Sequence, residues 1–458
     1  MPTINCNTTS FSLDSLKSAC NQLNNHISFH IPGHKGNKQF NQFLKQAEQL
    51  DLTELPGLDD LYDPKSHIKD IEKNLSQIYG SNETIISTNG ASSLIIASLI
   101  ELGKSASHII IPRNCHVSVI NGLILTSLTP IWLELDYCDD FKTFTKINLK
   151  TLENLILKNI NYNIGALLIT QPSYAGYLND VENIASLCAK YNLKLIVDEA
   201  HGAHLPFSHQ SNYSGLKHKA DIVIHSLHKT LSALSQAACL HLSERSGLNA
   251  IDLKQNLKLI STTSPSYLIM LSIEDSLKYI NDDFISKKIL LMEKFLSKLK
   301  LIDHIDIFNP ATNQDIFHIL IKDKNLAASD LMNILIDHNI YPEGIIGDGL
   351  LLMPGIGTST KDVEFILNVL PKTFKYKNNF NKKRPKQNSH LNFDQVMSPS
   401  QAYTKPSRLV KTEDSLNLIS AQTISKCPPG IPILVPGAKI TNAIIESIDD
   451  LFVKVVDV

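Results

Sequence analysis

A lysine and an aspartate each stand directly beyond a short apolar run of the chain. Lys229 follows the run 220–224, and Asp198 follows the run 193–197. Each run is typical of a buried parallel strand, and open α/β sheets bind ligands at the carboxyl ends of such strands. A lysine amine can form a Schiff base, and a carboxylate can keep a pyridine nitrogen protonated. The pair therefore predicts the chemistry of pyridoxal phosphate.

Two further segments supply groups that a bound pyridoxal phosphate needs. Gly90, Ala91 and Ser92 lie between a predicted strand and a predicted helix, where backbone N–H groups and a hydroxyl can approach a phosphate. His116 follows the next predicted strand, and a histidine there can stack on a pyridine ring. Taken alone, these residues are also typical of ordinary strand-to-helix turns. Their combination with Lys229 and Asp198 favours a cofactor site.

The elements that must position these residues alternate between strands and helices from about residue 68. The sequence predicts strands at 84–88, 108–112, 164–170, 193–197, 220–224 and 237–242, and helices at 68–79, 93–102 and 181–191. This order predicts an α/β fold with a parallel or mixed sheet and helices on both faces.

Composition changes along the chain predict five parts. They are an irregular N-terminal arm (1–60), a large cofactor-binding domain (61–280), a smaller α/β domain (281–372), an exposed linker (373–411) and a C-terminal module (412–458). The smaller domain has a predicted strand at 315–321. The linker is rich in Asn, Lys, Ser, Gln and Pro. The stretch 427–437 has too much proline for a helix or a central strand, so a turn-rich element is expected there.

Composition also restricts the class of protein. The chain has 458 residues, of which 43% are hydrophobic and 19% charged, as in globular proteins. Its net charge of -2 gives no reason to expect nucleic acid or an acidic membrane as partner. No apolar run approaches the roughly 18–20 residues of a membrane span, and the first residues do not resemble a secretion signal. The seven cysteines include no C-x-x-C pair, which is typical of reduced thiols in a cytoplasmic protein.

The segment 198–204 has three alternative interpretations. It matches the acidic DEAH motif of a helicase family, but that function needs a phosphate loop. The partial match at 103–105 has Ser98 where the loop requires glycine, and it follows a helix rather than a strand. Asp198, His201 and His204 are potential metal ligands, but their spacing fits no standard zinc pattern, and no metal is expected. The simplest alternative is a group of ordinary polar residues at a strand end.

Assembled in order, these segments give the chain a family resemblance. It resembles the prokaryotic ornithine/lysine/arginine decarboxylases, pyridoxal phosphate enzymes of the aspartate aminotransferase-like fold (fold type I), in their short form without a receiver-like domain. The matching segments are FHIPGHKG (29–36), LPGLDDL (55–61), PRNCH (112–116), QPSY (171–174), DEAHGAH (198–204), SLHKT (226–230), TTSP (262–265) and PPGIP (428–432).

The resemblance implies a role for each candidate site residue. Lys229 would hold the cofactor covalently, Asp198 would pair with the pyridine nitrogen, and His116 would stack on the ring. The phosphate would be surrounded by Gly90, Ala91, Ser92, Ser226 and His228, with Thr262 or Thr263 from a neighbouring subunit of a homodimer. His201 would lie near the ring hydroxyl, and His228 and Lys229 are candidates for returning a proton to the product.

The expected reaction is decarboxylation of a basic amino acid, arginine or lysine first and ornithine next, to an amine of the polyamine pathway. Transamination and β-elimination use the same cofactor. A transaminase of this fold normally binds the substrate carboxylate with an arginine of the small domain, and residues 280–372 contain none. A catalytically inactive cofactor-binding protein is a further alternative, against which the intact Asp198 and Lys229 argue.

Three positions depart from the family pattern. Val117 stands where the family usually has a basic residue, Cys427 replaces a usual tyrosine, and Ala438 replaces a usual glutamate. The last two belong to the C-terminal module, which lines the active-site entrance in relatives. These departures affect the expected substrate more than the expected reaction.

Overall fold

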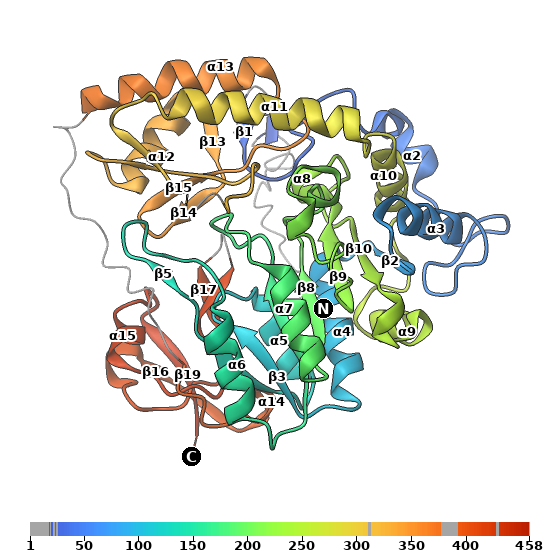
Figure 1. Ribbon diagram of the computed structural model, residues 1–458, viewed down its shortest axis with the longest axis vertical. Coiled ribbons are helices and arrows are strands. Elements are labelled where there is room, and N and C mark those ends of the chain that lie inside the picture. The colour runs from blue at the N-terminus through green and yellow to red at the C-terminus, as the bar shows by residue number, and fades with distance from the viewer. Residues whose placement is uncertain are drawn as a thin grey trace, which may run out of the picture.

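A seven-stranded sheet in the order β2-β10-β9-β8-β7-β3-β4 forms the centre of the protein (Figure 1). The computed structural model describes residues 26–309, 313–376, 393–426 and 430–457, together with 18, 20, 21 and 23. The strands are β2 (Glu83–Ser87), β3 (His108–Pro112), β4 (Thr129–Leu133), β7 (Ile164–Thr170), β8 (Lys194–Asp198), β9 (Ile222–Ser226) and β10 (Ala238–Leu242). Strand β10 is antiparallel to β2 and β9, and the other pairs are parallel. The predicted mixed, mostly parallel sheet is confirmed.

Successive side chains of the strands point to opposite faces, and helices cover both faces. Ile109 and Ile111 of β3 pack in a cluster with α4 (Gly90–Gly103), α5 (Val117–Leu125) and α9 (Ala250–Ile260). Ile110 lies between them in sequence and packs instead with α6 (Leu149–Lys158) and α7 (Val181–Lys190). Each such fully buried isoleucine stabilises the fold by roughly 1.5–3 kcal/mol.

The strand predictions were accurate where apolar runs were long, and β3 and β7 have the predicted bounds. Strand β4, at the sheet edge, was missed because its segment carries Thr129 and Pro130. Helix α4 begins at Gly90 rather than at residue 93. Between β1 (Ile27–Phe29) and residue 280, the remaining α-helices and strands are α2 (Ala47–Leu50), α3 (His67–Tyr79), α8 (Leu227–Thr230), α10 (Tyr267–Leu277), β5 (Tyr137–Cys138) and β6 (Thr143–Phe144).

A second, four-stranded sheet belongs to the smaller α/β part of the chain. Its order is β11 (Ile305–Ile307), β12 (Ile319–Asp323), β15 (Gly349–Leu352) and β14 (Gly344–Ile346). Helices α11 (Asp282–Leu299) and α13 (Thr360–Val369) run side by side along one edge of the molecule, beside α12 (Ala328–Asp337) (Figure 1). Strand β12 begins at Ile319, so the strand predicted at 315–321 starts too early, and residues 315–317 instead form a turn.

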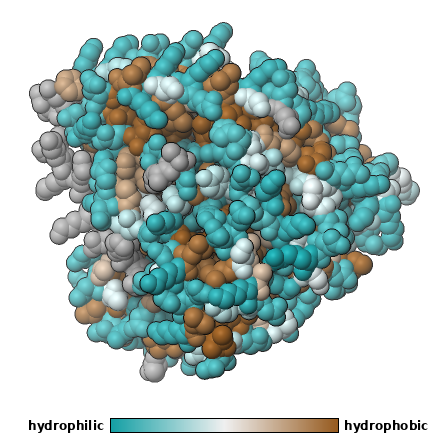
Figure 2. Space-filling view, in the orientation of Figure 1, coloured by the Kyte–Doolittle hydropathy of each residue, from teal (hydrophilic) through white to brown (hydrophobic). Residues whose placement is uncertain are grey.

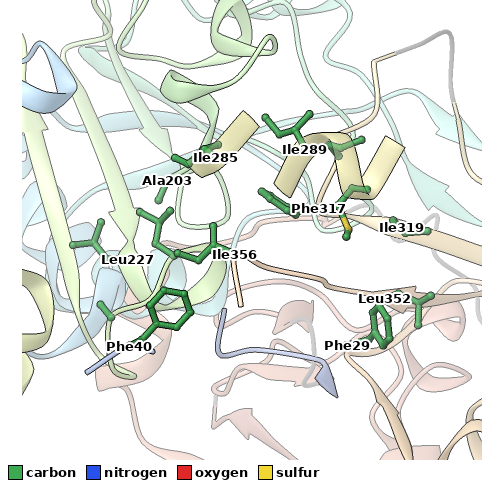
Figure 3. Packing of buried hydrophobic residues seen from close by; sticks show 14 of the residues in the cluster. Phe29, Phe40, Ala203, Leu227, Ile285, Ile289, Phe317, Ile319, Leu352 and Ile356 are labelled. Atoms are coloured by element: carbon green, nitrogen blue, oxygen red, sulfur yellow. The ribbon is translucent and has the colours of Figure 1, made fainter. Parts of the chain in front are cut away.

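One hydrophobic cluster joins the N-terminal arm to both α/β parts. In the arm, β1 (Ile27–Phe29) pairs with β13 (Ile340–Pro342) of the smaller part. Figure 3 shows Phe29 beside Leu352, and Phe40 below Ile356 and Leu227. Because these side chains are buried together, the arm fixes the two parts relative to each other.

The C-terminal module begins earlier than predicted. It contains α14 (Pro399–Thr404), β16 (Ser407–Lys411), β17 (Ile424–Lys426), β18 (Ile431–Leu434), α15 (Asn442–Ile445) and β19 (Phe452–Val456). Strand β16 pairs with β19, and Ser398 caps α14 in a capping box, so the segment 398–411 contains a capped helix and a paired strand. The predicted linker at 373–411 therefore differs from the structure over these residues, and 377–392 lie outside the described part. Strand β18 pairs only with β17 among the described strands, in keeping with its proline, Pro432.

The face seen in Figure 2 is mostly hydrophilic, with separate hydrophobic patches rather than one continuous band. Among the described residues, no helix combines the length and apolar character that crossing a membrane requires.

Candidate active site

A cavity of about 330 Å³ lies where the carboxyl ends of β8 and β9 meet the N-terminus of α4. It brings together the predicted residues Gly90, Ala91, Ser92, His116, Asp198, His201, Ser226, His228 and Lys229. Sequence reasoning did not assign the other lining residues, Asn89, Ile95, Tyr174, Ala200, Ser235 and Gln236. The volume is within the range of small-molecule sites.

Asp198 and Lys229 approach the cavity from adjacent strands. Asp198 is the buried last residue of β8, and Lys229 lies in the short helix α8 that follows β9. Burial raises the pKa of the Asp198 carboxyl, while the nearby Lys229 ammonium and the Ala200 N–H oppose that rise. The Ala200 N–H donates to Asp198 Oδ1 over 3.2 Å. A buried carboxylate held this way can stabilise a positive charge placed in the cavity.

His116 is held in one orientation at the start of α5. Its Nδ1 accepts the Ser118 backbone N–H over 3.2 Å and lies 2.8 Å from Ser118 Oγ. Burial, aided by the Lys229 charge, lowers the pKa of His116 to about 4. The ring is therefore neutral at neutral pH, and its flat face is suited to stacking.

The C-terminal module contacts this histidine through a glycine. A Cβ atom at Gly430 would lie 3.2 Å from the His116 ring, and its φ of +80° also disfavours other residues. The Gly430 carbonyl accepts the Val117 N–H over 3.0 Å. The module thus contacts the cavity wall beside Val117, one of the three positions that depart from the family pattern.

The N-terminus of α4 forms the wall across from Asp198. The Gly90 N–H donates to the Gln236 carbonyl over 2.8 Å, and Ala91 and Ser92 occupy the first helical turn. A helix N-terminus carries a partial positive charge that favours an anion such as phosphate. His228 also lines the cavity, and burial, followed by the Lys229 charge, lowers the pKa of His228 to about 4.

A chain of buried side chains runs from Lys229 into the smaller α/β part. Lys229 Nζ lies 3.0 Å from His201 Nε2, and His201 Nδ1 lies 3.2 Å from His318 Nε2. Asp315 joins two histidines, with Oδ2 2.6 Å from His318 Nδ1 and Oδ1 2.7 Å from His204 Nε2. The chain thus links the cavity lysine to a carboxylate on the turn before β12.

The electrostatics of this chain depend on Asp315. Burial alone would raise the pKa of Asp315, but His204 and His318 together hold it below its usual value. Burial and the Lys229 charge push the pKa of His201 well below its usual value, so that ring is neutral. Sequence reasoning missed Asp315 and His318, although both are polar residues at the start of an apolar run that was assigned to a strand.

Thr262 and Thr263 do not line this cavity within one chain. They follow α9 in an exposed segment, where the Tyr62 hydroxyl donates to the Thr262 carbonyl over 2.6 Å. Ala438 is fully buried in the cluster of the module and α5. Cys427 lies outside the described residues.

A family model described as "Orn/Lys/Arg decarboxylase, major domain" matches residues 16–353. The chain belongs to the Orn/Lys/Arg decarboxylase family. An uncharacterized Bacillus subtilis protein, YaaO, is 27% identical over 447 residues, which are 93% of this chain and 91% of that protein. The arginine decarboxylase of Halalkalibacterium halodurans is 26% identical, over 92% of this chain and 89% of its own length.

The fold is also similar to that of a decarboxylase of known structure. The structure of the Francisella novicida lysine decarboxylase LdcF superposes with a TM-score of 0.76 at 20% identity, covering 89% of this chain and 74% of that one. The predicted fold type I architecture is confirmed. As a member of the Orn/Lys/Arg decarboxylase family, the protein is an amino-acid decarboxylase, a lyase that acts on a basic amino acid.

We expect Asp315→Asn to lower the free energy of unfolding by about 3 kcal/mol, because it leaves two buried histidines without their anionic partner. The pKa of Asp315 is below its usual value. Its contribution is therefore complete above about pH 4 and is lost as the pH falls further. Urea unfolding from pH 8 to pH 3 measures this, and the difference between the two proteins should become smaller as the pH falls below about 4.

Asp306→Asn is the matched control in the same sheet. Asp306 forms a half-exposed pair with Lys324 at 3.4 Å, so its loss is expected to cost less than about 0.5 kcal/mol. Equal costs for both variants at pH 7 would contradict a special role for Asp315.

Proposed function

We propose that this protein decarboxylates arginine or lysine, and less readily ornithine, with pyridoxal phosphate bound in the cavity. The observation that supports this proposal most directly is that Lys229, Asp198 and the α4 N-terminus line one cavity. Arginine is the first candidate, because the relative named arginine decarboxylase matches over about nine-tenths of both chains. The product amine would belong to the polyamine pathway.

The residues of the cavity fit the parts of this cofactor. Ala91, Ser92 and Ser226 offer two hydroxyls and a helix N-terminus for the phosphate. Lys229 offers the amine that would carry the cofactor, and His116 offers a neutral ring to stack on it. When bound, pyridoxal phosphate supplies an electron-withdrawing ring that accepts the electron pair left as carbon dioxide departs.

Side chains of the cavity would then hold and transfer protons around that ring. Asp198 would hold the proton at the pyridine nitrogen, since its buried carboxylate is stabilised by a neighbouring positive charge. Lys229, 3.0 Å from His201, would return a proton to the α-carbon of the product; His228, the second candidate, would first have to take up a proton because burial keeps its ring neutral. His201 would orient the Lys229 amine through the chain that ends at Asp315.

The arginines of the described chain support decarboxylation over transamination. Buried Arg113 donates to the Pro432 carbonyl and stacks on Phe393 at 3.6 Å. Arg245 pairs with Asp221 at 3.3 Å, and Arg408 pairs with Asp457 at 3.2 Å. None of these lines the cavity among the described residues, so they would leave the substrate carboxylate without an arginine clamp.

Release of carbon dioxide and amine from arginine, lysine and ornithine tests the function directly. We expect purified protein with pyridoxal phosphate to act on arginine or lysine, and Lys229→Ala to lose nearly all turnover because covalent capture and proton return fail together. Borohydride reduction and peptide mapping should place the cofactor on Lys229. Lys217→Ala, which changes an exposed lysine, should retain activity. Amino transfer to a keto acid without carbon dioxide release would favour the transaminase alternative, and no turnover at all would favour an inactive cofactor-binding protein.

Asp198→Asn should keep covalent cofactor binding but reduce turnover by at least about 100-fold, because the ring nitrogen would lose the charge that keeps it protonated. The visible absorbance of bound cofactor and the rate of carbon dioxide release measure the two effects separately. Asp221→Asn changes a buried aspartate outside the cavity, and it should affect stability rather than cofactor binding or turnover. Near-normal turnover of Asp198→Asn would show that another residue pairs with the ring nitrogen.

We also propose a homodimer with shared sites, in which Thr262 and Thr263 reach the phosphate bound by the partner chain. Their exposure in one chain supports this arrangement. Mixing Lys229→Ala chains with chains carrying Thr262→Val and Thr263→Val should restore activity, since each mixed dimer holds one site without either lesion. No rescue after proven subunit exchange would contradict it, and a mixture of Lys229→Ala with Asp198→Asn, two lesions of one site, is the matched control.

The cytoplasm is the proposed compartment. The described cysteines Cys20, Cys115, Cys138, Cys188 and Cys239 are all unpaired, in keeping with a reducing environment.

A further inference from the structure

Three side chains with metal-binding groups converge on the sheet face beneath α3. They are His225 of β9 and Cys239 and His241 of β10, and their ligand atoms all lie within 4.8 Å of one another. His225 Nδ1 is 3.2 Å from His241 Nε2, which is 3.3 Å from Cys239 Sγ. The cross-strand pairing of Cys239 with His225 and the two-residue period of β10 place all three on one face.

The outward nitrogens of both histidines are held by other groups. His225 Nε2 lies 3.3 Å from Glu199 Oε1, and His241 Nδ1 lies 2.8 Å from Thr84 Oγ1. The Glu199 carboxyl in turn accepts the Ser214 hydroxyl and the Gly215 N–H, each over 2.7 Å. Metal-binding histidines characteristically have such a carboxylate or hydroxyl partner, which fixes the ring and directs the other lone pair at the metal.

We propose that His225, Cys239 and His241 bind one thiophilic metal ion, Zn(II) or Cu(I), through two neutral imidazoles and a thiolate. Metal–nitrogen bonds of about 2.0–2.1 Å and metal–sulfur bonds of about 2.3 Å allow one ion to reach all three atoms. A thiolate with two imidazoles selects these ions over Mg(II) or Ca(II), which prefer oxygen.

The protonation states agree with this proposal for the imidazoles. Burial lowers the pKa of His225 to about 3 and that of His241 well below its usual value, so both rings are neutral. Burial raises the pKa of the Cys239 thiol well above its usual value, so the ion must displace its proton. Binding therefore releases one proton from Cys239, and affinity should rise with pH.

An open cleft borders the Tyr79 ring that packs on this cluster. The cleft has a volume of about 730 Å³, and Tyr79 and Ser214 are among its lining residues. The Tyr79 ring packs on His225 and His241 with centroid distances of 5.0 and 4.6 Å. The Tyr79 ring therefore stands between the cleft and the two histidines.

The cluster lies directly behind the cofactor cavity. His225 precedes Ser226 on β9, so the ion would tie the strand end that carries this cavity residue to β10, and His225 also contacts Glu199, which follows Asp198. Its expected effect is on stability, since a ligand that binds only the folded state raises the melting temperature.

Metal analysis of the full chain, purified in chelator-free buffer without a histidine tag, tests the proposal. We expect one zinc or copper ion per chain after purification or after titration with Zn(II) or Cu(I), and X-ray absorption showing nitrogen and sulfur ligands. Substitution with Co(II) should give a thiolate-to-cobalt charge-transfer band. Neither ion bound, or an ion without a sulfur ligand, overturns the site and leaves the cluster a hydrogen-bonded network.

Cys239→Ala should reduce the bound metal from one ion per chain to none and abolish any shift of melting temperature by chelator. Cys188→Ala, which removes another buried thiol on α7, is the matched control and should keep the ion. Equal loss in both variants would overturn the assignment. If Cys239→Ala fails to fold, the cobalt and absorption spectra of the wild-type protein still decide. Cofactor absorbance is followed throughout, so failure of this site is distinguishable from failure of the cofactor proposal.

Discussion

The candidate active site depends on how the backbone around Lys229 is held. The Leu227 N–H donates to the Ala237 carbonyl over 3.0 Å, which ties the start of this segment to β10. The Gly33 N–H of the arm donates to the His228 carbonyl over 2.7 Å, and the Ile356 N–H of the smaller part donates to the Thr230 carbonyl over 3.1 Å. These bonds come from three distant parts of the chain. The position of the Lys229 amine is therefore a property of the whole fold.

This junction also explains the glycine at position 33. A Cβ atom there would lie 2.5 Å from the Leu231 carbonyl oxygen, a backbone atom that cannot move aside without displacing the lysine segment. The hydrophobic cluster of Phe40, Leu227 and Ile356 lies around the same point (Figure 3). Packing and hydrogen bonds thus agree on one arrangement, which is how a sequence specifies a preorganised site.

The sheet and most of the cavity could be predicted from the sequence, because buried parallel strands appear in a sequence as apolar runs with polar residues at their ends. Asp198 and Lys229 were found by that rule, whereas Ser226 was assigned through the family resemblance. The rule could not find Asp315 and His318, because they reach His201 through tertiary packing and have no fixed spacing from the cavity motifs. The same limit applies to Glu199 and His225, whose contact depends on the pairing of β8 with β9.

The C-terminal module shows how a departure from a family pattern can be understood physically. The Arg113 guanidinium stacks on Phe393 and donates to the Pro432 carbonyl, so this side chain holds the module against β3. Ala438 is fully buried among apolar side chains, where a glutamate would carry a desolvation cost of several kcal/mol. Position 438 therefore contributes packing rather than charge. Since Gly430 of this module contacts His116, the packing of the module bears on the shape of the cavity wall, and any recognition of the substrate's distal cation must come from other residues.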